Sequence, residues 1–181
     1  MIYIFTALKS EAQALVDKYK LQKNKIDNYT IFKNKDMVVI ITGIGFINCS
    51  NSCEFILRNY KVNSDDVFIN IGICGASQNY KIGELVEIGK IDFDNNSFIL
   101  NKTIDKTITC IDYEAKDNRY DLVDMESYGF YKSLNSYKNI FIFKIVSDHF
   151  EPQTITKDKT KMLLFDKLDN ILKKIVSHSR L

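Results

Sequence analysis

Hydrophobic and polar residues follow two different periods along this chain. Three apolar runs have the length and composition of β-strands: 1–7, 66–71 and 139–147. Three other stretches repeat apolar residues every three or four positions, the spacing of an amphipathic helix: 9–20, 46–60 and 157–177. Strands that alternate with helices predict an α/β fold. We therefore expect a single three-layer α/β/α domain with a mixed central sheet over residues 1–181.

Weaker patterns fill the rest of the chain. A hairpin is predicted over 29–42, where two strand-like runs flank an Asn-Lys-Asp turn. Further elements are expected as strands at 83–91, 107–112 and 121–124, and as a helix at 125–135. The Asn- and Asp-rich stretch 92–106 favours a short hairpin or a loop. Residues 113–120 are charged and lack glycine, which makes them the best candidate for a loop that covers a ligand.

Two glycine-containing segments adjoin predicted strands. Gly43-Ile44-Gly45 precedes the helix at 46–60, and residues 72–76 follow the strand at 66–71. We expect both to be turns that bring the backbone close to a ligand, at Gly43 in the first and at Ile73, Cys74 and Gly75 in the second. A lone Gly-x-Gly is weak evidence, so a strand-to-helix turn without a ligand is the alternative for the first segment.

Three acidic residues lie close to the carboxyl ends of predicted strands. Glu11 is one helical turn beyond the first strand, Glu126 follows the strand at 121–124, and Asp148 ends the apolar run from 139. Open α/β sheets bind ligands at this edge, and a buried carboxylate is costly without a partner or a role. The three acids therefore predict acid–base chemistry on a small polar molecule. The structural alternatives are a solvated helix end for Glu11, a favourable helix dipole for Glu126 and a loop cap for Asp148.

Composition and charge are those of an ordinary globular protein. The chain has 25 basic and 23 acidic residues, and its net charge of +2 is spread without long blocks, which argues against a nucleic-acid or membrane partner. No apolar run reaches the length of a membrane span, and the first residues lack the basic flank of a signal peptide, so a cytoplasmic protein is expected. The four cysteines lie in apolar or helical stretches and are expected to be reduced core residues. No metal and no cofactor are predicted.

Six segments of the chain resemble, in their order, the signature segments of the nucleoside phosphorylase superfamily. They are Ala7-Leu8-Lys9-Ser10-Glu11, Thr42-Gly43-Ile44-Gly45, Asn70-Ile71-Gly72-Ile73-Cys74-Gly75-Ala76, Ile82-Gly83-Glu84-Leu85-Val86, Asp124-Met125-Glu126 and Val146-Ser147-Asp148. The nearest branch is that of the methylthioadenosine/S-adenosylhomocysteine nucleosidases and the related futalosine hydrolases. The resemblance covers residues 1–150 and implies the fold of this superfamily, a small-molecule nucleoside as the substrate, and a homodimer.

The resemblance also implies a role for each matched side chain. Glu11 corresponds to the glutamate that deprotonates the attacking water, and Asp148 to the aspartate that bonds the purine N7 and protonates the leaving base. Glu126 corresponds to the glutamate that binds the ribose hydroxyls, Met125 to the methionine that packs against the sugar, and Ser147 to the serine that positions the aspartate or the base. These residue types suit cleavage of an N-glycosidic bond, because carboxylates stabilise a ribosyl cation and a protonated base can leave.

The superfamily contains both hydrolases and phosphorylases. A phosphorylase must bind a dianion, typically with Arg, and only Arg58, Arg119 and Arg180 occur here, none of them in or next to a matched segment. We therefore predict a nucleosidase that hydrolyses a purine nucleoside with a 5′ modification, of the methylthioadenosine, adenosylhomocysteine or futalosine type. A phosphate-dependent phosphorylase and a nucleoside-binding protein without turnover are the alternatives.

Overall fold

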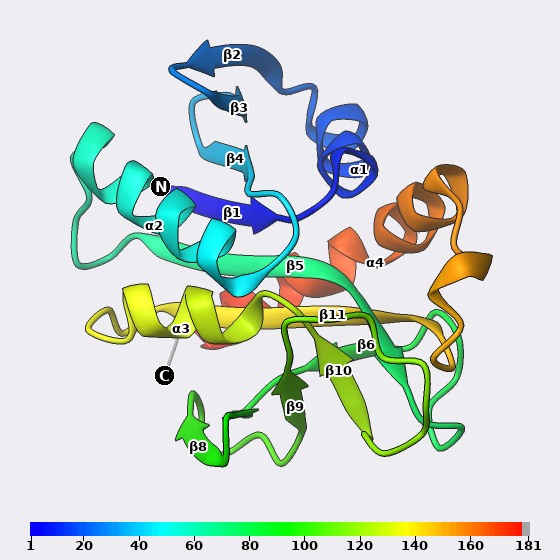
Figure 1. Cartoon of the computed structure of the whole chain (residues 1–181). Coiled ribbons are helices and arrows are strands. Elements are labelled where there is room, and N and C mark those ends of the chain that lie inside the picture. Colours follow the sequence, from blue (N-terminus) through cyan, green and yellow to red (C-terminus); the bar gives the residue numbers. More distant parts are fainter. Residues whose placement is uncertain (179–181) are drawn as a thin grey trace.

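The structure is a computed structural model of the chain, which describes residues 1–178 (Figure 1). Residues 179–181, which the single-domain prediction includes, lie outside the described part. The described strands are β1 (Ile2–Thr6), β2 (Gln22–Ile26), β3 (Tyr29–Lys33), β4 (Met37–Ile41), β5 (Val67–Ala76), β6 (Leu85–Glu87), β7 (Lys90–Phe93), β8 (Asn96–Ile99), β9 (Thr107–Cys110), β10 (Leu122–Asp124) and β11 (Ile140–Asp148). The described helices are α1 (Lys9–Tyr19), α2 (Phe46–Asn59), α3 (Ser127–Leu134) and α4 (Lys157–His178), with a 3₁₀ turn η1 (Pro152–Thr154) before the last.

The strands form one mixed sheet (Figure 1). Most of it has the order β2-β3-β4-β1-β5-β10-β9-β7-β8, and β11 pairs with β5 and β6. In the centre, β1 runs parallel to β4 and β5, and β11 runs parallel to β5. The outer hairpins are antiparallel, as is the pairing of β10 with β5. The predicted mixed sheet is therefore confirmed.

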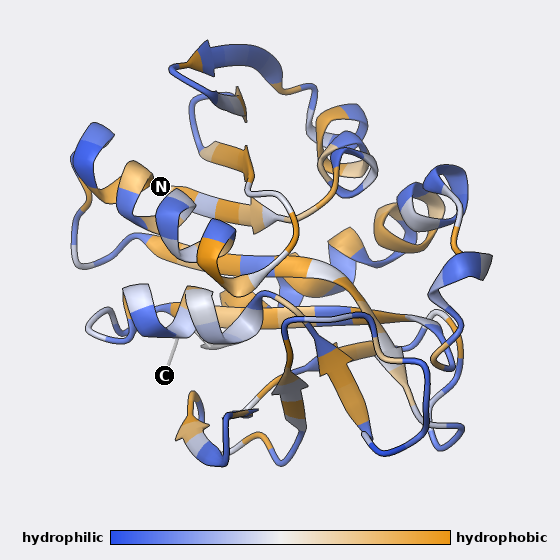
Figure 2. Cartoon of the chain, viewed as in Figure 1, coloured by the Kyte–Doolittle hydropathy of each residue, from blue (hydrophilic) through white to orange (hydrophobic). Residues whose placement is uncertain are grey.

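Helices cover both faces of the sheet centre, α2 and α3 on one face and α1 and α4 on the other (Figure 1). Each face has its own buried core. Phe5 and Phe130 belong to the core under α2 and α3, and Ile71 and Leu168 to the core under α1 and α4. Hydropathy follows the same layers, since the central strands are apolar and polar residues lie on the outer faces of the helices (Figure 2). The predicted three-layer arrangement is confirmed.

The helices lie within two residues of their predicted bounds. α3 begins at Ser127, two residues later than predicted, because Glu126 takes the N-cap position with non-helical backbone angles. The observed bounds of α1, α2 and α4 agree with the predicted ones to within one residue at each end. None of the helices in residues 1–178 combines the length and the apolar character needed to cross a membrane.

The observed strands differ from the prediction in three places. Residues 72–76 are not a turn but the second half of β5, because β11 pairs with β5 as far as Gly75. The single strand predicted over 83–91 is two strands, since β6 pairs with β11 while β7 pairs with β9. Strand β2 was not predicted, because it is a polar outer strand whose register comes only from its pairing with β3.

Strand pairing is interrupted along one edge of β5. β1 pairs with β5 as far as Asn70, and β10 pairs with it only at Gly75 and Ala76. Both occupy the same edge, because β11 pairs with these stretches of β5 from the other side. Within the described chain, residues 71–74 therefore have no strand partner on that edge. Those of their backbone N–H groups that point to this edge must bond to side chains or to a ligand instead.

Candidate active site

A cavity of about 270 Å³ lies where this interrupted edge meets the carboxyl ends of the central strands. Eight of the nine site residues predicted from the sequence line it: Glu11, Ile73, Cys74, Gly75, Met125, Glu126, Ser147 and Asp148. Gly43 is not among its described lining residues, although the adjacent Ile44 is. Long-range folding therefore gathers carboxylates from α1, the start of α3 and the end of β11 around one space.

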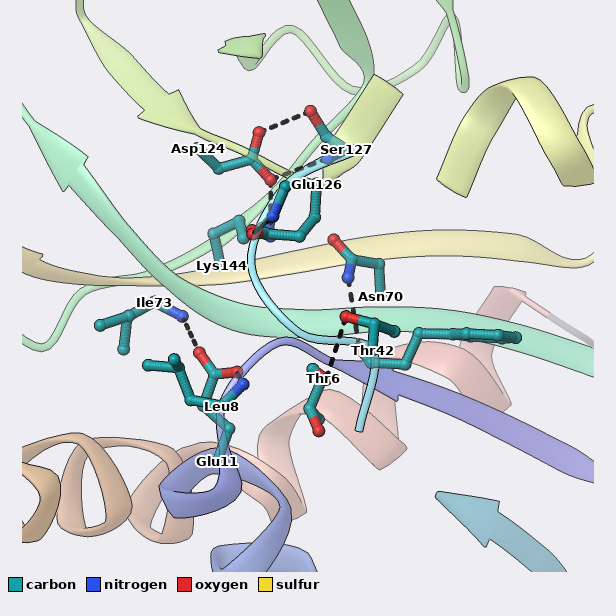
Figure 3. A network of polar contacts seen from close by, with 12 residues as sticks. Thr6, Leu8, Glu11, Thr42, Asn70, Ile73, Asp124, Glu126, Ser127 and Lys144 are labelled. Carbon is teal, nitrogen blue, oxygen red and sulfur yellow. Dashed lines mark hydrogen bonds and ion pairs between the residues drawn. The ribbon is translucent and has the colours of Figure 1, made fainter. Parts of the chain in front are cut away.

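Glu11 joins the start of α1 to the unpaired part of β5 (Figure 3). Leu8 at the N-cap offers no polar side chain, and Glu11 at N3 accepts its N–H at 2.9 Å through Oε2. Oε1 accepts the N–H of Ile73 at 2.9 Å. The residue is 2 % exposed, so it is not the solvated helix end considered as an alternative. Burial raises the pKa of this carboxyl, and the N–H donors of Leu8 and Ile73 oppose that rise.

Glycine is required at position 72 for this arrangement. A Cβ on Gly72 would lie 2.9 Å from Oε1 of Glu11, closer than such atoms approach one another in proteins. The missing side chain therefore makes the space that the carboxylate occupies. Sequence inspection points to Gly72 as a turn residue, whereas its role here is close approach within a strand.

Glu126 lies on the other side of the cavity and binds the start of α2. Its Oε1 accepts the N–H of Gly45 at 3.0 Å, so this N–H of the Gly-x-Gly segment binds a carboxylate of the protein itself. Gly45 has φ +101°, which a residue with a side chain rarely adopts. Burial raises the pKa of Glu126 to about 7; the charge of Lys144 opposes this rise and that of Asp124 adds to it.

Asp148 ends β11 at a bulge, where the register against β5 shifts between Val146 and Asp148. Its Oδ1 accepts the N–H of Glu151 at 2.9 Å, which is the loop cap considered as an alternative. Its Oδ2 lies 2.6 Å from Oγ of Ser147, and the same Oγ lies 3.0 Å from the carbonyl oxygen of Cys74. Ser147 can therefore donate to a carboxylate, or accept from a protonated Asp148 while donating to Cys74. The loop cap uses Oδ1 of Asp148, so Oδ2 is available for proton transfer.

Sequence reasoning missed a buried ion pair beside these acids. Nζ of Lys144 lies 2.6 Å from Oδ2 of Asp124 and 3.8 Å from Oε2 of Glu126, and the Lys144 side chain is 1 % exposed (Figure 3). Asp124 also accepts the N–H and the hydroxyl of Ser127, at 3.0 and 2.6 Å. The signal was a lysine inside an apolar strand covered on both faces, because such a lysine needs a buried acidic partner.

Apolar side chains form a further wall of the cavity: Ile44, Ile111, Val123, Phe150, Pro152 and Ile155. The loop predicted to cover a ligand contributes Tyr113, Glu114 and Ala115 to the lining. The hydroxyls of Tyr113 and Tyr120 lie 2.6 Å apart and tie the two ends of this loop together. An apolar wall facing a few convergent carboxylates is the usual form of a small-molecule site.

Comparisons with known proteins identify the fold. No protein-family model matches the sequence, and no curated protein matches it. Among solved structures, a Campylobacter jejuni 5′-methylthioadenosine/S-adenosylhomocysteine nucleosidase superposes with a TM-score of 0.76 at 18 % identity, over 99 % of both chains. The Neisseria meningitidis nucleosidase in complex with methylthio-immucillin-A gives 0.76 at 15 % identity, over 97 % of both chains.

A Helicobacter pylori futalosine hydrolase superposes with a TM-score of 0.74 at 12 % identity, over 98 % of this chain and 97 % of its own. Identities this low are informative about the fold and leave the substrate to be argued from the cavity. The match extends over the central mixed sheet and its flanking helices. The chain therefore has the α/β fold of the 5′-methylthioadenosine/S-adenosylhomocysteine nucleosidases and of futalosine hydrolase.

Proposed function

We propose that the protein is a nucleosidase, which hydrolyses the N-glycosidic bond of a purine nucleoside with a modified 5′ position. The observation that carries the proposal is the convergence of Glu11, Glu126 and Asp148 on one cavity with an apolar wall. Carboxylates around a ribosyl group stabilise the cationic character that develops as the bond to the base breaks. The apolar wall suits the flat face of a purine.

Each carboxylate has a separate task in the proposed reaction. Glu11 takes a proton from the attacking water, and burial raises the pKa of this carboxyl, which makes it a stronger base. Asp148 gives a proton to the leaving base, and Ser147 orients it through the 2.6 Å contact. Glu126 binds the ribose hydroxyls, and Met125 packs against the sugar. Water thus adds to the sugar carbon while the base leaves with a proton, and solvent returns the proton on Glu11 to Asp148.

Water is a better nucleophile for this cavity than phosphate. The described residues that line the cavity include no Arg or Lys, and five of them carry carboxyl groups: Glu11, Glu114, Asp124, Glu126 and Asp148. A phosphate dianion would meet like charges there instead of the Arg clamp that phosphorylases use. The proposal is therefore hydrolysis, with methylthioadenosine, adenosylhomocysteine and a futalosine as the substrates to try first.

The proposal includes a single domain that acts as a cytoplasmic homodimer. Ile44 and Ile47, at the start of α2, are 51 % and 62 % exposed, and Ile44 lines the cavity. Exposed apolar residues beside a cavity are a common feature of protein–protein interfaces. Sedimentation equilibrium of the wild type and of an Ile47→Lys variant tests this part, and a wild-type monomer at micromolar concentration would contradict it.

A base-release assay tests the reaction. Purified protein is incubated with the three nucleosides, with and without phosphate, and free base is measured. We expect release without phosphate, and a loss of at least 100-fold in Glu11→Gln and Asp148→Asn, since general acid–base groups contribute about 10²–10⁴-fold. Glu54→Gln is the matched control, because Glu54 is an exposed residue on α2 whose ion pair is with Arg58.

Three outcomes would count against the proposal. Full activity in Glu11→Gln and Asp148→Asn would remove the proposed roles. Release that requires phosphate would make the protein a phosphorylase. Thermal stabilisation by the nucleosides without any released base would make it a binding protein.

A further inference from the structure

Lys144 lies at the centre of a buried polar network that connects four elements (Figure 3). Its ammonium contacts Asp124 at 2.6 Å and Glu126 at 3.8 Å, and the side chains of these two acids are 0 % and 9 % exposed. Through its other oxygen, Glu126 binds the N–H of Gly45 at the start of α2. The network thus links β10, β11, α2 and the first residue of α3 beside the cavity.

Asp124 is held by three donors. Its Oδ1 accepts the Ser127 hydroxyl, and its Oδ2 accepts both the Ser127 N–H and the Lys144 ammonium. Three donors from two elements keep it in place. Asp124 therefore anchors Lys144, and the next acid within reach of the ammonium is Glu126.

Register places a third acid near the same lysine. Lys144 pairs with Gly72 on β5, and the space above Gly72 holds the carboxylate of Glu11. The described residues that line the cavity include Glu11 and Glu126 but not Lys144. The lysine thus lies beneath the cavity floor, with carboxylates on two sides.

We propose that Lys144 is a positioning residue, which fixes the orientation and the negative charge of Glu126 toward the cavity without itself contacting a ligand. The inference rests on the proposed function, because the charge of Glu126 matters if this residue binds sugar hydroxyls. An ionised carboxylate accepts two hydroxyl protons, whereas a protonated one loses an acceptor. Lys144 would thereby set the pH range in which the sugar is bound.

Opposed charges surround Glu126 from every element packed against it. Lys144 on β11 and the N–H of Gly45 favour the ionised form, and Asp124 on β10 and Glu11 on α1 disfavour it. The thiols of Cys49 on α2 and Cys110 on β9 also interact with this carboxylate. Burial has the largest effect and raises the pKa of Glu126 to about 7. Replacement of Lys144 or Asp124 by an uncharged residue should therefore change the ionised fraction of Glu126 near neutral pH.

Two substitutions with opposite expected signs test the proposal. In protein labelled with ¹³C at the Glu side-chain carboxyl, the Glu126 resonance is the one missing from Glu126→Gln, and its titration midpoint is measured by NMR. Lys144→Met should raise the midpoint by about one pH unit or more, and Asp124→Asn should lower it by a similar amount, since each removes one close charge. Lys144→Arg should restore a value near that of the wild type.

Kinetics provide the second readout. If the Glu126 midpoint rises from about 7 by one unit, the ionised fraction at pH 7 falls about fivefold. In Lys144→Met, KM for an active nucleoside should therefore rise about fivefold at pH 7 and recover at pH 9, with a smaller change in kcat. A loss of packing alone would not recover with pH.

The outcomes separate this inference from the proposed function. Midpoints that move as expected in a protein that releases no base would support the role of Lys144 and overturn the nucleosidase proposal. Midpoints within 0.3 unit of the wild type in both variants would overturn the role of Lys144, whatever the activity. If Lys144→Met does not fold, Lys144→Gln, which keeps a polar side chain without the charge, takes its place, and a midpoint within 0.3 unit of the wild type contradicts the proposal.

Discussion

The Glu126→Gln variant should be more stable than the wild type at alkaline pH. Gln keeps an oxygen that can accept the N–H of Gly45, but it carries no charge into the buried network. Ionised Glu126 is costly in the folded protein, because burial and the nearby Asp124 raise its pKa from an ordinary 4.5 to about 7. At about 1.4 kcal/mol per pH unit, this corresponds to about 3 kcal/mol.

The sign of the pH dependence follows from the two pKa values. Below pH 4.5 the residue is protonated in both the folded and the unfolded chain, so its ionisation contributes nothing to stability. Between pH 4.5 and 7 the unfolded chain loses this proton first, and the folded wild type becomes progressively less stable. Above pH 7 Glu126 is ionised in both states, and the loss of stability has reached its full value. Gln does not titrate, so the advantage of the variant should grow across this window and then stay constant.

Urea unfolding at several pH values between 4 and 8.5 measures this advantage. We expect the difference in unfolding free energy between Glu126→Gln and the wild type to increase by about 3 kcal/mol, or roughly 6–12 °C in Tm for a chain of this size. Glu54→Gln is the control, and its difference should change by less than about 1 kcal/mol, because the ion pair of the exposed Glu54 with Arg58 lies on the surface. An increase of less than 1 kcal/mol, or an advantage that shrinks with pH, would refute the reasoning.

Three further predictions concern the surroundings of the cavity. Gly72→Ala puts a Cβ 2.9 Å from Oε1 of Glu11, so the carboxylate must shift and base release should fall at least 100-fold. The free energy of unfolding should fall by about 1–3 kcal/mol, and unchanged activity would contradict the assigned position of Glu11. Gly129→Ala puts a Cβ 1.9 Å from the backbone oxygen of Phe46, so α2 and α3 must separate, and urea unfolding should show a loss of about 3 kcal/mol or more; a stable variant would contradict this packing. Burial raises the pKa of Cys74, so iodoacetamide at pH 8 should leave this cysteine unmodified in the folded protein, and rapid labelling seen by mass spectrometry would contradict its burial.

Local pattern was sufficient for most of the secondary structure and for the acids. Strand 139–147 is apolar almost throughout because helices cover both of its faces, and the structure places β11 there. Glu11 and Asp148 could be singled out because they follow β1 and β11, and parallel strands bring their carboxyl ends to one edge. Glu126 also follows a strand, but β10 is antiparallel to β5, so its place beside the other two acids depends on the tertiary structure. Both inferences depend on short-range sequence and on a general rule of α/β folds.

Local pattern failed where pairing partners decide the conformation. Residues 72–76 have the composition of a turn, yet they extend β5 because β11 lies beside them. The Gly43-Ile44-Gly45 segment was expected to approach a ligand at Gly43, whereas the N–H of Gly45 binds Glu126, which is 81 positions away in the chain. Neither contact has a signature within a short window of sequence, because both partners come from distant segments.

By itself, the sequence determined an α/β alternation, six ordered signature segments and three acids at strand ends. Tertiary structure decided how these acids are held. Lys144 and Asp124 are 20 residues apart on different strands, and only folding brings them to 2.6 Å beneath the cavity. The physical reason is that a buried charge must be neutralised by whichever partner the fold brings near, and a sequence shows the charge without showing that partner.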